Sequence, residues 1–160
     1  MFWLVANVLL TANGGHLAMT AAKTGKWLMT IGIGIFVFAP PVVDILTPTH
    51  VFNADWVPHA RFHTMWAILS TSAIGILALW LLWRGPALHK FGTHLAGVIG
   101  SCVLGAFMLA AATMSLYGGA LSDANGVPLL AIGVDANLVT FGVALALILA
   151  GWRLAARGGD

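Results

Sequence analysis

Residues 58–84 read PHARFHTMWAILSTSAIGILALWLLWR, and no Asp, Glu, Lys or Arg stands between Arg61 and Arg84. A helix that crosses the hydrocarbon core of a bilayer needs about 20 consecutive, mostly apolar residues. Pro58 suits the first turn of such a helix, because its missing N–H would have no partner within the helix there. The stretch therefore predicts a membrane-spanning helix that begins at Pro58.

The composition of the whole chain extends this prediction. Of the 160 residues, 60% are hydrophobic and 8% are charged, whereas about a quarter of the residues of a soluble domain are charged. The net charge of +2 leaves no basic face for phosphates, which excludes a nucleic-acid partner. Cys102 is the only cysteine, which excludes disulfides within the chain and zinc sites built on cysteine. We predict one all-α, polytopic membrane domain over residues 1–160.

Four apolar runs are long enough to cross a bilayer, and together they predict a four-helix transmembrane bundle. They cover residues 27–46, 58–83, 91–117 and 132–153. A further apolar run, residues 2–22, is interrupted by polar side chains and glycines. It is a candidate fifth helix that either spans the membrane or lies in its interface.

The basic residues predict the orientation of the bundle. Six of the seven flank the same ends of the four runs, which places them on one side of the membrane. By the positive-inside rule that side is cytoplasmic, so we expect a multi-pass protein of the bacterial inner membrane with its basic loops and C-terminus in the cytoplasm. The six residues are Lys23, Lys26, Arg84, Lys90, Arg153 and Arg157.

The opposite ends of the runs carry the residues that are suited to chemistry. Ionisable side chains at a membrane are costly and usually face the bundle or a wet cavity, so a cluster of them indicates a site. The densest cluster is THVFNADWVPHARFH, residues 49–63, which leads into the second run. Asp55 or Asn53 is expected to cap the helix that starts there. We predict a functional site at this end of the bundle.

His59 and His63 are four residues apart, so both imidazoles project from one face of the predicted helix. This spacing lets both histidines bind one metal ion through their ring nitrogens. Alternatively, one histidine binds haem iron and the other lies beside it. The alternative is a pair of interfacial imidazoles that hydrogen-bond to carbonyl groups and water. Arg61 lies on another side of the helix, where it can reach a carboxylate, a cofactor propionate or a lipid phosphate. Asp44 is either a third metal ligand or the ion-pair partner of Arg61.

Four further polar residues fall at the same end of the bundle. His50 is a candidate metal ligand or a solvated loop residue. Tyr117, the only tyrosine, either polarises a substrate oxygen or is an interfacial tyrosine. Asp135 and Asn137 open the fourth run, where one of them is expected to cap the helix and either can belong to the site.

Small residues recur four apart in the third run, at Ala96 and Gly100 and again at Ser101 and Gly105. This pattern permits close approach between helices, within one subunit or between subunits. It is compatible with a homo-oligomer.

Two resemblances involve the segment 49–63. The whole segment resembles the signature of an uncharacterised group of small bacterial four-helix membrane proteins, which implies no function. Ala60-Arg61-Phe62-His63, the basic loop after the second run, the glycine-containing third run and the polar loop before the last run are similar to styrene oxide isomerase. In that family of small membrane enzymes an Ala-Arg-x-His histidine ligates haem b between the subunits of a trimer.

The resemblance implies that His63 is the axial ligand of haem b and that ferric iron acts as a Lewis acid on an epoxide. This chain departs from the family after the histidine, where Thr64-Met65-Trp66 replaces Ser-Gly-Pro. The family's substrate-site tyrosine in the third span also has no matching residue, because Tyr117 lies further along the chain.

The first function that we predict follows from this resemblance: isomerisation of a lipophilic epoxide to an aldehyde or ketone by haem b bound to His63. Tyr117, Asn137 or Asp44 would orient the substrate. Arg61 would hold a haem propionate or brace the loop.

Two other functions fit the same residues. One is a non-haem Fe, Cu or Zn enzyme for a lipophilic substrate, with a site made of His59, His63 and Asp44 and with His50 as a further ligand. The other is a non-catalytic membrane subunit whose histidines are structural. No His-Glu-x-x-His or Gly-x-Ser-x-Gly motif supports another class of enzyme.

Overall fold

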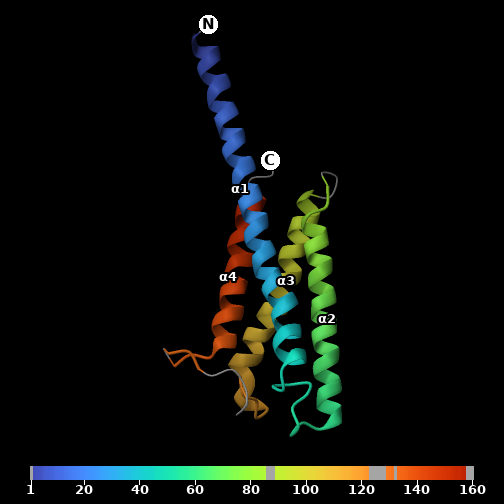
Figure 1. Ribbon diagram of the computed structural model, residues 1–160. Helices are drawn as coiled ribbons and strands as arrows, with labels where there is room; N and C mark the ends of the chain where they lie inside the picture. The colour runs from blue at the N-terminus through green and yellow to red at the C-terminus, as the bar shows by residue number, and fades with distance from the viewer. Residues whose placement is uncertain (1, 86–88, 123–128, 132, 158–160) are drawn as a thin grey trace.

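A computed structural model describes residues 2–85, 89–122, 129–131 and 133–157, with side chains described from residue 19 onward except for that of His89. The described chain is helical and contains no strand. Successive helices run up and down the bundle (Figure 1), which confirms the predicted all-α fold. The helices are α1 (Phe2–Pro40), α2 (Pro58–Leu82), α3 (His89–Thr113) and α4 (Ala136–Arg157).

Four helical segments are long and apolar enough to cross a membrane. Their bounds agree closely with the predicted runs at most ends, and the second begins at Pro58 as expected. The fourth begins at Ala136 instead of residue 132, because the carboxylate of Asp135 accepts a hydrogen bond from the Asn137 N–H (2.8 Å) and caps α4 there. The segments are Met19–Ile45, Pro58–Leu82, Lys90–Leu116 and Ala136–Arg157.

Residues 2–22 do not form a separate fifth helix. They are continuous with the first predicted span in α1, a single helix of 39 residues. At 1.5 Å per residue this helix is about 58 Å long, roughly twice the thickness of the hydrocarbon core. Its N-terminal part extends beyond the ends of the other helices (Figure 1).

Two consecutive prolines, Pro40 and Pro41, end α1 and lead into a π-helical turn, η1 (Pro41–Ile45). Pro41 has no N–H to donate to the carbonyl of Val37, four residues earlier. That carbonyl accepts a hydrogen bond from the Ser72 hydroxyl of α2 instead (3.0 Å). The backbone group that the proline leaves free therefore links α1 to α2.

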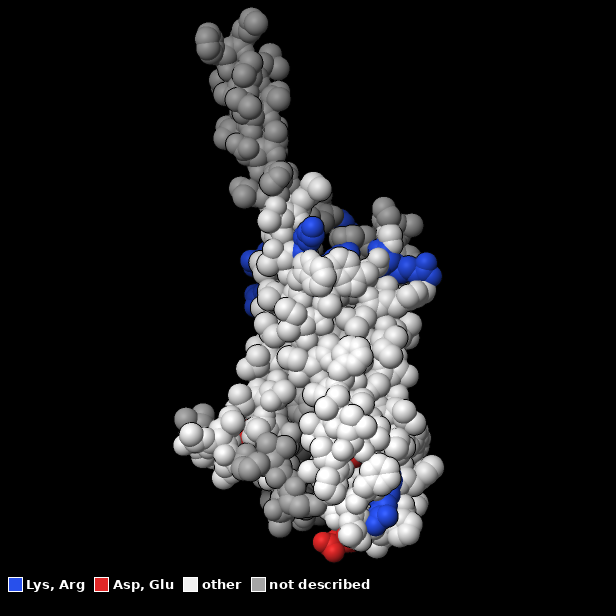
Figure 2. Space-filling model, in the orientation of Figure 1, with Lys and Arg blue, Asp and Glu red and all other residues white. Residues whose placement is uncertain are grey.

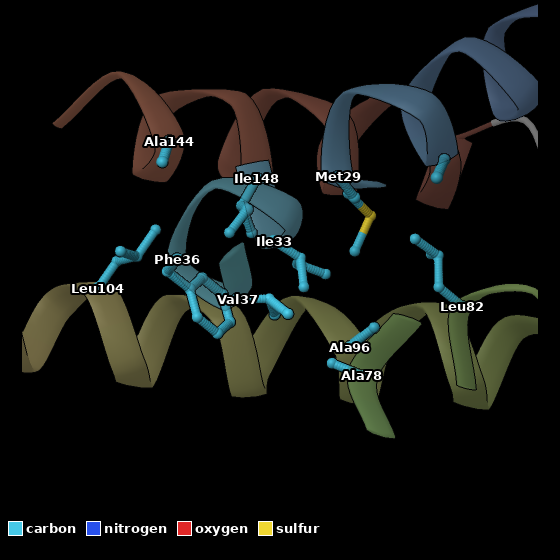
Figure 3. Close-up of a cluster of buried hydrophobic side chains, with 11 residues drawn as sticks. Met29, Ile33, Phe36, Val37, Ala78, Leu82, Ala96, Leu104, Ala144 and Ile148 are labelled. Atoms are coloured by element: carbon cyan, nitrogen blue, oxygen red, sulfur yellow. The ribbon is translucent and has the colours of Figure 1, made fainter. Parts of the chain in front are cut away.

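The core lies where all four helices meet, and Figure 3 shows its side chains interdigitated between them. Alanines occupy several of the most buried positions, which lets the helices approach closely. The buried cluster consists of Met29, Ile33, Phe36, Val37, Ala78, Leu82, Ala96, Leu104, Ala144, Ile148 and Ala155.

The first pair of small residues in α3 serves packing within the subunit. Ala96 is completely buried, and a Cβ atom at Gly100 would lie 2.9 Å from Cδ1 of Ile148. A Cβ atom at Gly105 would meet nothing within 4 Å. The small residues that recur four apart in α3 therefore do not form one continuous surface of contact with the other helices.

We predict that Gly32 is required for the contact between α1 and α4. A Cβ atom there would meet the Ala144 carbonyl oxygen at 2.6 Å and Cγ1 of Ile148 at 2.7 Å. Gly32→Ala should lower the free energy of unfolding by about 1–3 kcal/mol, the usual cost of overpacking. The matched control is Gly34→Ala, because a Cβ atom at Gly34 has nothing within 4 Å. Equal thermal stability of the two variants in detergent would contradict the packing.

Charge is strongly polarised along the bundle. Lys and Arg side chains gather at the end from which α1 extends, and the acidic side chains in view lie at the opposite end with one basic side chain (Figure 2). We call the end at which Lys and Arg gather the basic end, and the opposite end the acidic end. The predicted separation of charge is therefore present in the structure.

Candidate functional site

The acidic end is built by the loop between η1 and α2, residues 46–57. The hydroxyl groups of Thr47 and Thr49 both donate to the carbonyl of Val43, in the last turn of the helix. The two hydroxyl oxygens also lie 2.7 Å apart. These bonds curl the loop back over the end of α1, an arrangement that the sequence analysis did not anticipate.

Asp44 pairs with His50 and not with Arg61. Its Oδ1 lies 3.1 Å from Nδ1 of His50, and its carbonyl accepts a hydrogen bond from the Val51 N–H (3.1 Å). The ring of Trp56 packs edge-on against the imidazole, with 5.3 Å between centroids. Of the two roles left open for Asp44, the ion pair with Arg61 does not form, because the curled loop brings His50 to the carboxylate instead.

Arg61 braces the loop. Its Nη2 donates to the carbonyls of Asn53 (2.7 Å) and Ala54 (3.3 Å), and its Nε donates to the carbonyl of Trp56 (3.1 Å). Bonds from a charged donor are stronger than those from a neutral one. Through these three carbonyls the guanidinium fixes the end of the loop against the first turn of α2.

The expected cap of α2 by Asp55 or Asn53 is wrong. Val57 is the N-cap residue, and no side chain bonds to the start of the helix. The side-chain oxygen of Asn53 instead accepts a hydrogen bond from the Asp55 N–H (3.0 Å), which closes a turn within the loop. Pro58 at the first helical position removes one of the donors that a cap would satisfy.

His59 and His63 meet on the outer face of α2, as their spacing predicts. Their Nε2 atoms are 3.0 Å apart, and their rings are almost perpendicular (89°). One imidazole therefore donates an Nε2–H to the bare Nε2 of the other. Both rings are exposed, and they are flanked by Phe62 (63% exposed) and Trp66 (58% exposed).

The structure arranges the four candidate metal ligands as two separate pairs. It joins His59 to His63 and Asp44 to His50, and among the residues whose side chains are described no three His, Cys, Asp or Glu are grouped closely enough to hold one metal ion. The four candidate ligands therefore do not converge within a single subunit.

The other predicted site residues bond to backbone. The hydroxyl of Tyr117 donates to the carbonyl of Ala110 (2.8 Å) on the preceding turns of α3. The side-chain amide of Asn137 donates to the carbonyl of Leu121 (3.2 Å). Asp135 is buried and caps α4. The sequence predicted that either Asp135 or Asn137 would be this cap. Residues 123–128 of the polar link lie outside the described residues.

No family model matches the chain, and neither curated proteins nor solved structures give a match to it. Its function is therefore inferred from the arrangement of its own residues.

Proposed function

We propose that this protein is a membrane enzyme that isomerises a lipophilic epoxide to an aldehyde or ketone, using haem b held by His63. The observation that carries the proposal is the position of His63, an exposed imidazole with the aromatic side chains of Phe62 and Trp66 beside it. A flat porphyrin needs such an open, apolar surface around its axial ligand. In the bundle core, Ala78 and Ala96 are completely buried, so the helices are in close contact there.

The reaction suits the residues at this end. Ferric haem supplies a Lewis acid, which stabilises negative charge on the epoxide oxygen without a protein nucleophile. The rearrangement breaks one C–O bond and moves a hydrogen or carbon substituent to the neighbouring carbon, so it consumes no oxidant or reductant. Phe62 and Trp66 would present an apolar surface to the reacting carbon atoms.

His59 and Arg61 act as positioning residues. In this proposal Nε2 of His63 carries the proton and donates it to Nε2 of His59 (3.0 Å), so the bare Nδ1 of His63 would be the iron ligand and His59 would hold its ring in one orientation. Arg61 holds the loop through its three carbonyl acceptors, which favours the role of bracing the loop over that of binding a propionate. Tyr117 and Asn137 are candidates for orienting the substrate from the same end.

The exposed position of His63 also favours an assembly. A cofactor bound on the outer face of α2 needs a second copy of this chain to cover it, and the resemblance to styrene oxide isomerase implies a trimer. The proposed location is the bacterial inner membrane, with the basic end in the cytoplasm. The acidic end and its histidines then lie at the outer surface of that membrane.

The test is a visible absorption spectrum of the detergent-purified protein together with its metal content. We expect a Soret band and equal amounts of iron and porphyrin. Protein that stays colourless after haem is supplied during expression would contradict the proposal. Absence of both haem and metal, with another polypeptide in the preparation, would point to a non-catalytic membrane subunit instead.

A second candidate is a non-haem metal enzyme for a lipophilic substrate, favoured by the distance between the two Nε2 atoms. Two imidazole ligands at about 2.0–2.1 Å from one metal ion are roughly 3.0–3.4 Å apart, and those of His59 and His63 are 3.0 Å apart. Fe, Cu or Zn would replace the proton between the Nε2 atoms of His59 and His63. Groups other than these two histidines would supply the remaining ligands.

We expect this second candidate to give stoichiometric metal without porphyrin. His59→Ala and His63→Ala should then lower the metal content equally, because a chelate needs both nitrogens. Elemental analysis of the two variants and of His50→Ala, which leaves the pair intact, measures this. Full retention of metal in the double variant of His59 and His63 would exclude it.

A further inference from the structure

At the basic end, a tryptophan joins α1 to α2. The indole N–H of Trp83 donates to the hydroxyl of Thr30 (2.9 Å), and that hydroxyl donates to the carbonyl of Lys26 (2.8 Å). The ring of Trp83 packs against that of Trp27, with 5.0 Å between centroids. Both rings are exposed on the outer surface of the bundle.

This arrangement holds two cations over neighbouring indole rings. The ammonium of Lys26 lies 5.6 Å from the centroid of Trp83, and the guanidinium carbon of Arg84 lies 3.8 Å from that of Trp80. Trp80 and Trp83 are three residues apart on α2, so they are neighbours on one face. Lys26 is only 7% exposed, so its alkyl chain is buried and its position is restricted.

These cations have no negative partner within the described part of the chain. The ion pair found there, Asp44 with His50, is at the other end of the bundle. The remaining described carboxylates, Asp55 and Asp135, also belong to the acidic end, as the separation of red from blue in Figure 2 illustrates. The described residues therefore supply no carboxylate at the basic end, which favours the binding of an anionic group from another molecule there.

We propose that Lys26, Arg84, Trp80 and Trp83 form a binding site for the phosphate group of an anionic phospholipid. Indole rings sit at the level of the lipid headgroups, and basic sites at the cytoplasmic end of membrane helices bind anionic headgroups. The apolar flank of α2 below the site, where Ile76 and Leu77 are exposed, receives the acyl chains. A free phosphate ion would gain nothing from that flank, which favours the lipid.

Lys26 and Lys23 provide a matched pair of variants for the test. Lys23 is three residues earlier on the same helix and is exposed, so Lys26→Gln and Lys23→Gln remove the same charge at nearly the same depth. Native mass spectrometry of delipidated protein measures the binding of phosphatidylglycerol and of phosphatidylcholine. We expect a preference for phosphatidylglycerol, which Lys26→Gln weakens about 5-fold, the equivalent of one headgroup contact, and Lys23→Gln weakens less.

Arg84→Gln supplies a second variant, because this exposed residue can be changed even if Lys26→Gln prevents folding. It should weaken phosphatidylglycerol binding to a similar extent. Equal effects of Lys26→Gln and Lys23→Gln would overturn the proposal, because they would indicate general attraction by the charged end. Equal binding of the two lipids would also overturn it, and displacement of the lipid by inorganic phosphate at the same concentration would identify a site for free anions.

Discussion

His63→Ala is expected to abolish the Soret band of the purified protein. Haem iron bound by one protein ligand dissociates when that ligand is removed, and combining His63→Ala with His59→Ala excludes replacement by the neighbouring imidazole, whose Nε2 lies 3.0 Å from that of His63. Isomerisation of an aryl or alkyl epoxide by the purified protein should be lost with the band. Absorption spectra of the variant expressed with supplied haem, together with assay of the aldehyde product, measure both effects.

Two other histidines act as controls for this result. His59→Ala should keep the band and change only its position or intensity, because that imidazole bonds to His63 and is not the ligand. His94→Ala should leave the band unchanged, because His94 is on α3, where its Nδ1 accepts a hydrogen bond from the indole of Trp152 (2.9 Å). A Soret band of full intensity in His63→Ala would refute haem ligation by this residue.

Arg61→Ala is expected to lower the free energy of unfolding by about 2–4 kcal/mol. The side chain makes two short bonds to loop carbonyls, at 2.7 and 3.1 Å, and a hydrogen bond to a charged group contributes about 1.5–3 kcal/mol. The loss should be local, because the core of the bundle does not involve this residue. Chemical denaturation in detergent gives the change in free energy, and limited proteolysis shows whether residues 46–57 become susceptible to cleavage.

Arg61→Lys separates geometry from charge. Lysine keeps the positive charge but lacks the planar group that reaches several carbonyls at once, so it should recover only part of the stability. If Arg61→Ala has the stability of the wild type and residues 46–57 stay resistant to proteolysis, the loop is held without the guanidinium. If Arg61→Ala loses haem but keeps its stability, the residue binds a propionate instead of the loop.

The helical spans were predictable because each depends on local chemistry. The run after Pro58 is apolar for longer than a bilayer is thick, and α2 accordingly begins at that proline. Asp135 could be identified as a helix cap because its side chain needs only a neighbouring N–H. The bounds that were wrong, such as the start of α1, depend on whether a helix continues past weak interruptions, which composition alone does not determine.

The pairing of site residues was predictable only along a single helix. His59 and His63 meet because a separation of four residues places them on one face. Asp44 meets His50, and not Arg61, because hydrogen bonds from Thr47, Thr49 and Val51 curl the intervening loop over the end of the helix. No periodic pattern in the sequence encodes that path. The Ser72 bond to the Val37 carbonyl similarly joins residues 35 positions apart.

The sequence by itself determined that the chain forms apolar helices and that its 8% of charged residues divide into a basic and an acidic end. Both follow from the cost of placing charge in hydrocarbon, which acts on each residue separately. The tertiary structure alone decided that His50 pairs with Asp44, that Arg61 holds the loop, and that Lys26 lies over Trp83. Those contacts join segments brought together by packing, and packing depends on the shapes of all four helices at once.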